Sequence, residues 1–278
     1  MTQRGPQDRA PGGSWLVPGF DTTVANPARV WNYWVGGKDN FAVDREVGRK
    51  VLELLPFMPM IARYARRFLV DAVRQLSADC GIRQFLDIGT GLPTADNTHE
   101  VAQRAAPESR VVYVDNDPVV LAHARALLTS SPEGKTGYIA ADLREPGTIL
   151  AGAEDILDFR EPVAVLLVAV LHFVPDTDDP YGLVARLMDA VPRGSYLAIV
   201  HAASDIQAGA VAESMGRYNQ MSSTPITMRT GGQVARFFDG LDLTGPGVVP
   251  LDEWWPPDEV EYGALGVLAG YAGIARKP

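Results

Sequence analysis

"FLDIGTGLP", residues 85–93, joins an apolar run to an acidic residue and two glycines. Asp87 stands two positions before Gly89, and Gly91 follows after one further residue. A short run of apolar residues is typical of a buried strand. Glycines in the turn after such a strand let the backbone approach a ligand closely, which is how many α/β folds bind nucleotides. The stretch therefore predicts an α/β fold with a nucleotide-like ligand at this turn.

The residues around the glycines favour a positively charged ligand over a phosphate group or a dinucleotide. A phosphate-binding loop needs a lysine after its last glycine, but Gly91 is followed by "LPTADN". A dinucleotide fingerprint needs a third glycine where this chain has Thr94. Asp87 would also repel a pyrophosphate, whereas a carboxylate suits a ligand with a positive group. S-adenosylmethionine carries an ammonium and a sulfonium and no phosphate, so the turn favours this cofactor.

Two further acidic residues follow the next two expected strands. "RVVYVD" (110–115) ends in Asp115, and "GYIAA" (137–141) leads to Asp142. The carboxyl ends of parallel strands meet at one rim of a sheet. There Asp115 can accept hydrogen bonds from ribose hydroxyls, and Asp142 can accept one from an adenine amino group. Each aspartate alone is often a cap or turn residue, but three successive ones favour a cofactor site.

Apolar patterning predicts strands and helices in alternation. Strands are expected at 84–88, 110–115, 137–141, 163–170 and 194–202, with a closing pair at 243–251 and 265–275. Helices are expected at 44–55, 60–81, 97 onward, 116–128, 179–191 and 230–238, and residues 215–221 read as irregular. The capping pairs Asn97/Glu100 and Thr230/Gln233 mark two of the helix starts. Such alternation implies a doubly wound parallel sheet with helices on both faces.

Composition and charge exclude several other classes of function. The net charge of −9 gives no attraction to nucleic acid or to an anionic membrane. A lone Cys80 permits neither an intrachain disulfide nor a cysteine metal site, and no metal-ligand spacing occurs elsewhere. The most apolar run, 162–175, is too short to span a bilayer, and residues 1–14 read as a disordered tail. We therefore expect a cytoplasmic protein with no metal, nucleic-acid or membrane partner; a homodimer stays open.

An aromatic stretch, "WNYWVGGKDNF" (31–41), precedes the first expected helix. It could supply satellite core residues, or it could be a lid that folds over the cofactor. In a lid, Tyr33 or Trp34 could face the sulfonium through a cation–π contact. Gly36 and Gly37 would then permit close approach of the backbone.

The acceptor of a methyl group should lie near the end of the fourth strand, where "VLHFVPD" (170–176) contains His172 and Asp176. Histidine titrates near neutral pH, so His172 is the candidate base or orienting group, with a packed strand-end histidine as the alternative. "DDPY" (178–181) reads as a helix cap rather than as a catalytic motif. Three more side chains could complete the acceptor pocket: Arg66, His99 and Tyr218.

Three stretches, "FLDIGTGLP", "VVYVDNDP" and "IAADL", resemble the successive cofactor motifs of class I S-adenosylmethionine-dependent methyltransferases. With "NPARVWNYWVGGKDNF" and the tail "GYAGIARKP", residues 20–278 resemble a bacterial subfamily, a domain of unknown function described as S-adenosyl methyltransferase. The resemblance implies a Rossmann-like seven-stranded sheet whose last strand is antiparallel. It implies an N-terminal lid with helices at 15–80 and a methyltransferase domain at 81–278, the two forming one structural unit.

The same resemblance assigns cofactor roles by motif. Asp87, Gly89 and Gly91 would hold the methionine part of S-adenosylmethionine, and Asp115 the ribose. Asn116, Asp142 and Leu143 would contact the adenine. We expect an S-adenosylmethionine-dependent methyltransferase that acts on a small molecule by in-line transfer. Two alternatives stay open: a module that binds the cofactor without catalysis, and a nicotinamide-dependent dehydrogenase on the same fold.

Overall fold

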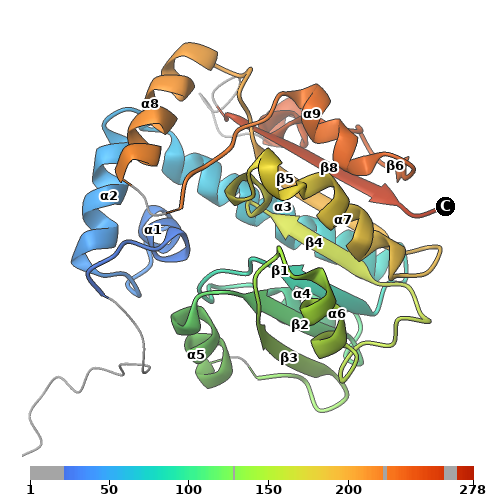
Figure 1. The fold of residues 1–278 in the computed structure, drawn as a ribbon. Coiled ribbons are helices and arrows are strands. Elements are labelled where there is room, and N and C mark those ends of the chain that lie inside the picture. The colour runs from blue at the N-terminus through green and yellow to red at the C-terminus, as the bar shows by residue number, and fades with distance from the viewer. Residues whose placement is uncertain (1–21, 128, 222–223, 260–267) are drawn as a thin grey trace, which may run out of the picture.

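The computed structural model describes residues 22–127, 129–221, 224–259 and 268–278 (Figure 1). The tail predicted at 1–14 lies outside these residues, as do positions 265–267 of the last expected strand. The strands are β1 (Gln84–Ile88), β2 (Arg110–Asp115), β3 (Lys135–Ala140), β4 (Ala164–Val168), β5 (Tyr196–Ala202), β6 (Asp242–Leu243), β7 (Val249–Pro250) and β8 (Gly270–Arg276). The helices are α1 (Pro27–Trp34), α2 (Ala42–Leu52), α3 (Met58–Ala78), α4 (Thr98–Ala105), α5 (Pro118–Leu127), α6 (Pro146–Ala153), α7 (Pro180–Asp189), α8 (Ala208–Met221) and α9 (Gly231–Ala235).

All eight strands form one sheet, which confirms the predicted doubly wound architecture. Its order is β3-β2-β1-β4-β5-β8-β6, with the short β7 also paired to β8. Strands β1 to β5 are parallel, and β8 runs antiparallel to β5. The closing pair is therefore antiparallel as expected, although a second short strand beside β8 brings the count to eight rather than seven. Because β1 lies between β2 and β4, the strand order reverses there, which is where such sheets bind ligands.

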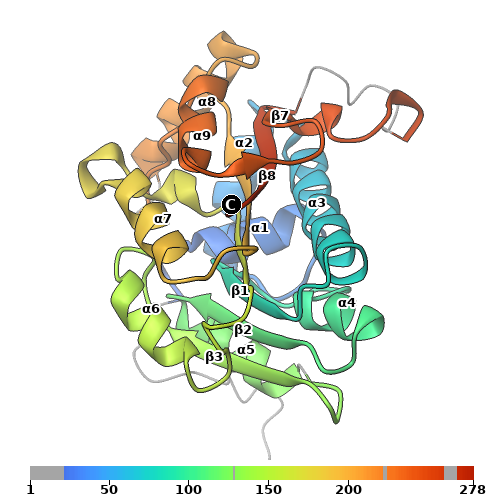
Figure 2. The same ribbon diagram turned by 90° about the vertical axis from the view of Figure 1, so that its right-hand side faces the viewer.

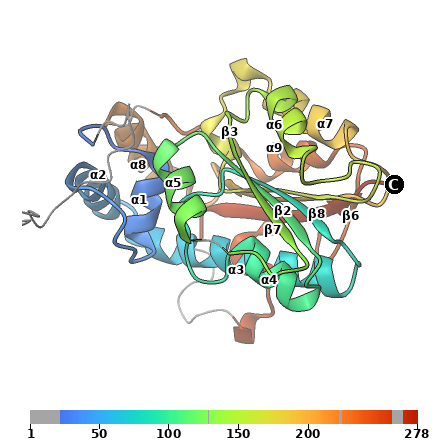
Figure 3. The ribbon, with the colours of Figure 1, turned by 90° about the horizontal axis from the view of Figure 1, so that it is seen from below.

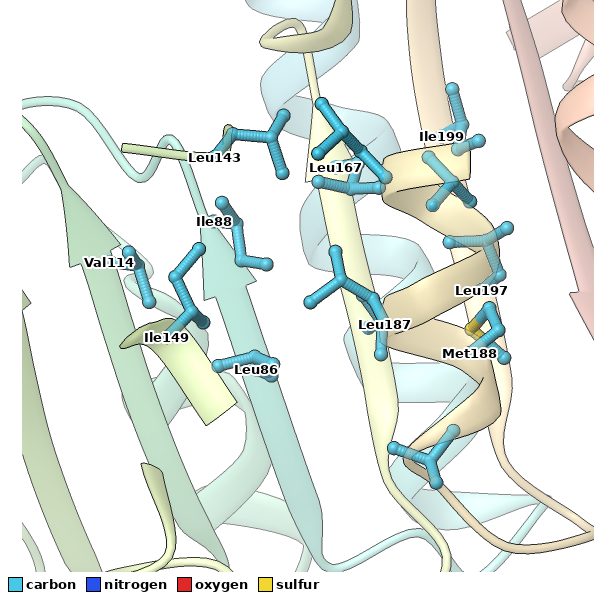
Figure 4. Packing of buried hydrophobic residues seen from close by; sticks show 14 of the residues in the cluster. Leu86, Ile88, Val114, Leu143, Ile149, Leu167, Leu187, Met188, Leu197 and Ile199 are labelled. Carbon is cyan, nitrogen blue, oxygen red and sulfur yellow. The ribbon is translucent and has the colours of Figure 1, made fainter. Parts of the chain in front are cut away.

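Both faces of the sheet are buried, and successive side chains along each strand alternate between them. In β1, Phe85 packs toward α3 and α4, whereas Leu86 and Ile88 pack toward α6 and α7. Figures 2 and 3 show these two helical layers on opposite sides of the sheet. Figure 4 shows the second layer, in which Ile149 and Leu187 pack with the β1 side chains. This two-sided burial explains why the strand sequences are apolar runs in which apolar and polar residues do not alternate.

The helix caps predicted from the sequence are confirmed. The Asn97 backbone N–H donates to Glu100 at 2.7 Å, and the Asn97 side chain completes the capping box. Thr230 and Gln233 form the same box at α9. Asp179 accepts from the Gly182 N–H at the start of α7, so the "DDPY" letters form a cap there.

The helices differ from the expectations in three places, one of which is α6, where no helix was expected. Residues 215–221, which read as irregular, form the second half of α8. Gly216 and Asn219 weaken the local helix signal, but Val211, Met215 and Tyr218 lie on one face of α8 and pack against α1 and α2. Residues 27–34, read only as an aromatic stretch, form α1, whose cap is Asn26.

A buried guanidinium ties this N-terminal part to the sheet. Arg29 of α1 is 3% exposed, and its Nε lies 3.6 Å from Asp44 of α2 and 3.8 Å from Asp117, which precedes α5. Asp44 also accepts backbone N–H groups of Asn26 and Phe41, at 3.0 and 2.8 Å. Since both carboxylates are buried, this one cation links three segments of the chain: α1, α2 and the turn before α5.

Replacing Arg29 with methionine should lower the free energy of unfolding by about 3–5 kcal/mol, since two buried carboxylates would lose their cation. Urea denaturation at pH 7 measures this change. Lys50→Met is the control, because Lys50 pairs with Glu46 at the exposed surface of α2 and contributes little. A loss for Arg29→Met no larger than that of the control would contradict this account of the anchor.

Candidate active site

Two adjoining cavities open at the carboxyl edge of the parallel strands. The larger has a volume of about 390 Å³ and the smaller about 70 Å³. The larger one lies within the size range of small-molecule sites. Helix α1 and the end of β4 contribute to both walls. The lining residues that the two cavities share are Pro27, Trp31, Ala65, Ala169 and Phe173.

The glycine turn after β1 forms one wall of the larger cavity. Gly89 and Gly91 have φ angles of +73° and +66°, a region that favours glycine. The Gly89 N–H donates to the Val114 carbonyl at 2.8 Å, which holds the turn against β2. A Cβ at Gly89 would overlap the Val170 side chain, whereas one at Gly91 would meet no atom within 4 Å. Gly89 therefore permits close packing, and Gly91 keeps space open for a ligand.

Asp87 presents a buried carboxylate to the larger cavity. Its Oδ2 accepts from the Thr98 hydroxyl at 2.6 Å. Burial raises the pKa of Asp87 to about 6, although the Thr98 hydrogen bond and the charge of Arg66 oppose the shift. Arg66 donates through Nη2 to the Ala95 and Asp96 carbonyls. A positive ligand group beside Asp87 would replace the hydration that burial removes.

The other two rim carboxylates differ in their surroundings. Asp115 accepts from the backbone N–H groups of Gly91 and Asp117, both at 2.9 Å, and burial raises its pKa to about 6. Burial alone would raise the pKa of Asp142, but hydrogen bonds from Arg144 and Asn116 outweigh it and hold the pKa below its usual value. Asp142 is therefore charged at neutral pH and lies in reach of Asn116, at 3.1 Å.

The smaller cavity is largely apolar and is lined by two buried histidines, His172 and His201. His172 lies in the turn η1 (Leu171–Phe173), and its Nδ1 has no hydrogen-bond partner among the described residues. Burial, with His201 and Arg229 nearby, lowers the pKa of His172 well below 6.5. His172 is therefore neutral at physiological pH, with its ring 5.7 Å from that of His201.

The hydrogen bonds of His201 assign its tautomer. Its Nδ1 lies 2.8 Å from the Ala202 carbonyl, which can only accept, so Nδ1 carries the hydrogen. Its Nε2 lies 2.8 Å from Nη1 of Arg229, which can only donate, so Nε2 accepts. Burial lowers the pKa of His201 to about 3, and both nitrogens are already used.

The structure brings most of the predicted site residues to these cavities. The larger one is lined by Arg66 and by seven predicted cofactor residues: Asp87, Gly89, Gly91, Asp115, Asn116, Asp142 and Leu143. The smaller one is lined by His172, Trp34 and Tyr218.

Five predicted residues line neither cavity. Gly36 ends α1 with φ +81°, and a Cβ at Gly37 would overlap the Asn32 side chain, so these two glycines serve the turn after α1. Tyr33 packs beside Gly48 of α2. The remaining two residues also have partners elsewhere: His99 pairs with the Tyr113 hydroxyl at 2.8 Å, and Asp176 with Arg229 at 2.6 Å.

Some lining residues were not found from the sequence. Trp31 borders both cavities, and its spacing from Trp34 (i, i+3) could have indicated a shared helix face. Ala169 adopts φ +59° at the end of β4, which is a strained conformation for a residue with a Cβ. No pattern in the sequence predicts this conformation. Arg229 lines neither cavity but holds the turn that contains His172; it was missed because it is a single arginine that becomes buried only through contacts with distant segments.

The larger cavity fits S-adenosylmethionine. Asp87 offers a carboxylate for a cationic group, Asp115 and Asp142 offer acceptors for hydroxyl and amino groups, and the space beside Gly91 is open. Within the described part of the chain, no group of three or more metal-ligating side chains occurs. Nor does any helix there have the length and apolarity needed to cross a membrane.

Comparison with known proteins agrees with this geometry. A family model described as S-adenosyl methyltransferase matches residues 14–278. A DUF574 family protein from Streptomyces avermitilis MA-4680 is 42% identical, with a TM-score of 0.89 over 93% of this chain and 99% of that one. A candidate methyltransferase from Thermobifida fusca YX is 38% identical, with a TM-score of 0.86 over 95% and 99%. None of the curated proteins matches this chain.

The two glycines of the turn should respond differently to alanine. Gly91→Ala should cost about 1–2 kcal/mol of unfolding free energy from its positive φ alone. Gly89→Ala should lose about 1–3 kcal/mol more, because its Cβ must also displace Val170. Urea denaturation of both variants measures the difference. Equal losses would show that Val170 does not restrict this turn.

Proposed function

The chain belongs to the S-adenosyl methyltransferase family, and on that premise we propose that it methylates a small molecule bound in the smaller cavity. The family uses S-adenosylmethionine, which supplies an electrophilic methyl group on a sulfonium sulfur. One observation carries the proposal: an acidic cavity and an apolar cavity with a neutral histidine share a wall formed by Trp31, Ala169 and Phe173. A methyl donor in the larger cavity and a methyl acceptor in the smaller cavity would lie side by side.

The rim residues supply the contacts proposed for the cofactor. Asp87 pairs with the ammonium group, and Asp115 accepts from the ribose hydroxyls. Asn116 and the Asp142-Leu143 pair contact the adenine. The observations that support these roles are the burial of Asp87 and Asp115 and the position of all these residues on the larger cavity.

His172 is the proposed base or orienting group for the acceptor. Methyl transfer is an in-line displacement, and holding the two reactants in line can supply most of the catalysis. The chain contributes by positioning both molecules and by excluding water with α1. A neutral imidazole can in addition accept a proton that the acceptor loses. The unpartnered Nδ1 of His172 supports this role; the low pKa keeps the imidazole neutral and able to accept a hydrogen bond, although it also weakens the imidazole as a base.

Titration calorimetry distinguishes the methyltransferase from the alternative dehydrogenase. S-adenosylmethionine should bind with measurable heat at pH 7.5, and NAD should not bind, because the carboxylates at the glycine turn repel a pyrophosphate. Binding of NAD without binding of S-adenosylmethionine would refute the proposal.

The affinity for S-adenosylmethionine should rise with pH. With its pKa near 6, Asp87 is mostly neutral at pH 5 and charged at pH 7, so the dissociation constant should fall about ten-fold between these values. Asp87→Asn should weaken binding at pH 7 and remove the part of this dependence that comes from Asp87, whereas Asp115, whose pKa is also about 6, keeps its part. Calorimetry at both pH values measures it, and an Asn variant with an unchanged pH profile would contradict the pairing with the ammonium group.

The same variant offers a check on folding. Because the pKa of Asp87 lies above its ordinary value of 3.8, the folded chain holds this proton more tightly than the unfolded chain. Ionisation of Asp87 therefore lowers the free energy of unfolding as the pH rises from about 4 to 7. Asp87→Asn lacks this loss and should remain folded at pH 7, so weaker binding would not result from unfolding.

A further inference from the structure

We propose that the methyl acceptor is an uncharged, largely apolar molecule with at most one ring that presents a hydroxyl group to His172. This inference rests on the proposed function and specifies the substrate class of the same site. It is carried by the smaller cavity, which adjoins the end of β4 where His172 lies.

The first observation is the absence of charge in the cavity wall. Among the described residues that line it, none is aspartate, glutamate, lysine or arginine. The larger cavity, in contrast, is lined by two arginines and three aspartates: Arg66, Arg144, Asp87, Asp115 and Asp142. A charged acceptor group would lose its hydration in the smaller cavity without gaining a counter-ion, which is strongly unfavourable. The wall therefore selects against carboxylates, phosphates and ammonium groups.

The nearest buried cation cannot supply that counter-ion. Arg229 donates to the Leu171 and Val174 carbonyls, to the Asp176 carboxylate and to Nε2 of His201. These contacts occupy its five N–H donors. Arg229 thus holds the turn that contains His172 against β5, and its charge is balanced by Asp176.

Several polar atoms of the wall already have partners within the protein. His201 uses both ring nitrogens, and Nε1 of Trp34 donates to the Gly48 carbonyl at 3.3 Å. His172 keeps an Nδ1 without a partner among the described residues. A neutral imidazole nitrogen accepts a hydrogen bond from a hydroxyl, whereas an alkyl ammonium would also add an uncompensated charge.

The rest of the wall favours a flat, polarisable body. It combines aromatic side chains with methionines, which pack well on rings; these are Trp31, Trp34, Phe173, Tyr218, Met58, Met215 and Met228. The small volume, about 70 Å³, excludes fused rings. In the transfer, the hydroxyl proton goes to His172, the oxygen lone pair forms the bond to the methyl carbon, and the electrons of the broken S–C bond stay on sulfur.

Four probes of similar size test the substrate class: 4-propylphenol, 3-(4-hydroxyphenyl)propionate, tyramine and propylbenzene. Their dissociation constants are measured by calorimetry on the full chain saturated with S-adenosylhomocysteine. We expect 4-propylphenol to bind at least ten-fold more tightly than the anionic, cationic and hydroxyl-free probes. With S-adenosylmethionine, mass spectrometry should detect its methyl ether. Equal or tighter binding of a charged probe, no advantage over propylbenzene, or no binding of 4-propylphenol would overturn the inference.

A matched pair of variants tests the location. Met228 is half-buried in the cavity wall, so Met228→Glu introduces an anion there, whereas Met228→Leu keeps the wall apolar. Met228→Glu should shift the ratio of the two dissociation constants at least ten-fold in favour of tyramine over 4-propylphenol, and Met228→Leu should leave that ratio unchanged. An unchanged ratio in Met228→Glu, with S-adenosylmethionine affinity retained, would place the acceptor elsewhere.

Titration of the unmodified chain with S-adenosylmethionine separates the two levels of the proposal. If the cofactor does not bind, the proposed function itself fails. If the cofactor binds and a charged probe is preferred, only the acceptor class is wrong.

Discussion

The position of α1 over the strand ends depends on one buried cation. The guanidinium of Arg29 lies between carboxylates of α2 and of the turn before α5, and it is almost completely excluded from solvent. Breaking such an arrangement leaves buried charge, so the N-terminal helices have a strong electrostatic reason to stay on the sheet edge. Since α1 lines both cavities, neither would have its present wall without this anchor. Figure 1 shows α1, α2 and α8 grouped at this end of the sheet.

The two cavities share walls but differ in electrostatic character. Carboxylates from successive strand ends give the larger cavity an acidic rim, and burial raises the pKa of two of them, Asp87 and Asp115. The smaller cavity is formed where α1, α8 and the turn after β4 meet, and its histidines are neutral. This division fits a family that transfers a methyl group from a cationic donor. A cation needs carboxylates, whereas an uncharged acceptor needs apolar surface and one proton acceptor.

Prediction from the sequence succeeded where the structural signal was local. The strand-then-turn pattern placed Asp87, Asp115 and Asp142 at one rim, because parallel strands end at the same edge. Prediction was less successful in the aromatic stretch. There Trp31 borders both cavities, whereas Tyr33 packs beside α2. The rotation of α1 about its axis decides between these neighbours. Arg29, Val30 and Trp34 are among the buried side chains that fix this rotation, and their partners lie in other segments of the chain.

The sequence by itself determined the doubly wound sheet and the acidic rim, because apolar periodicity, glycine turns and caps act over a few residues. The antiparallel last strand was expected only from the resemblance to a known family. Only the tertiary structure decided which side chains form the smaller cavity. Its wall combines α1, the turn after β4, the end of β5 and α8, which are distant along the chain. Val211, Met215 and Tyr218 of α8 pack on the N-terminal helices, so neither α8 nor the wall of the smaller cavity could be predicted from the local sequence pattern.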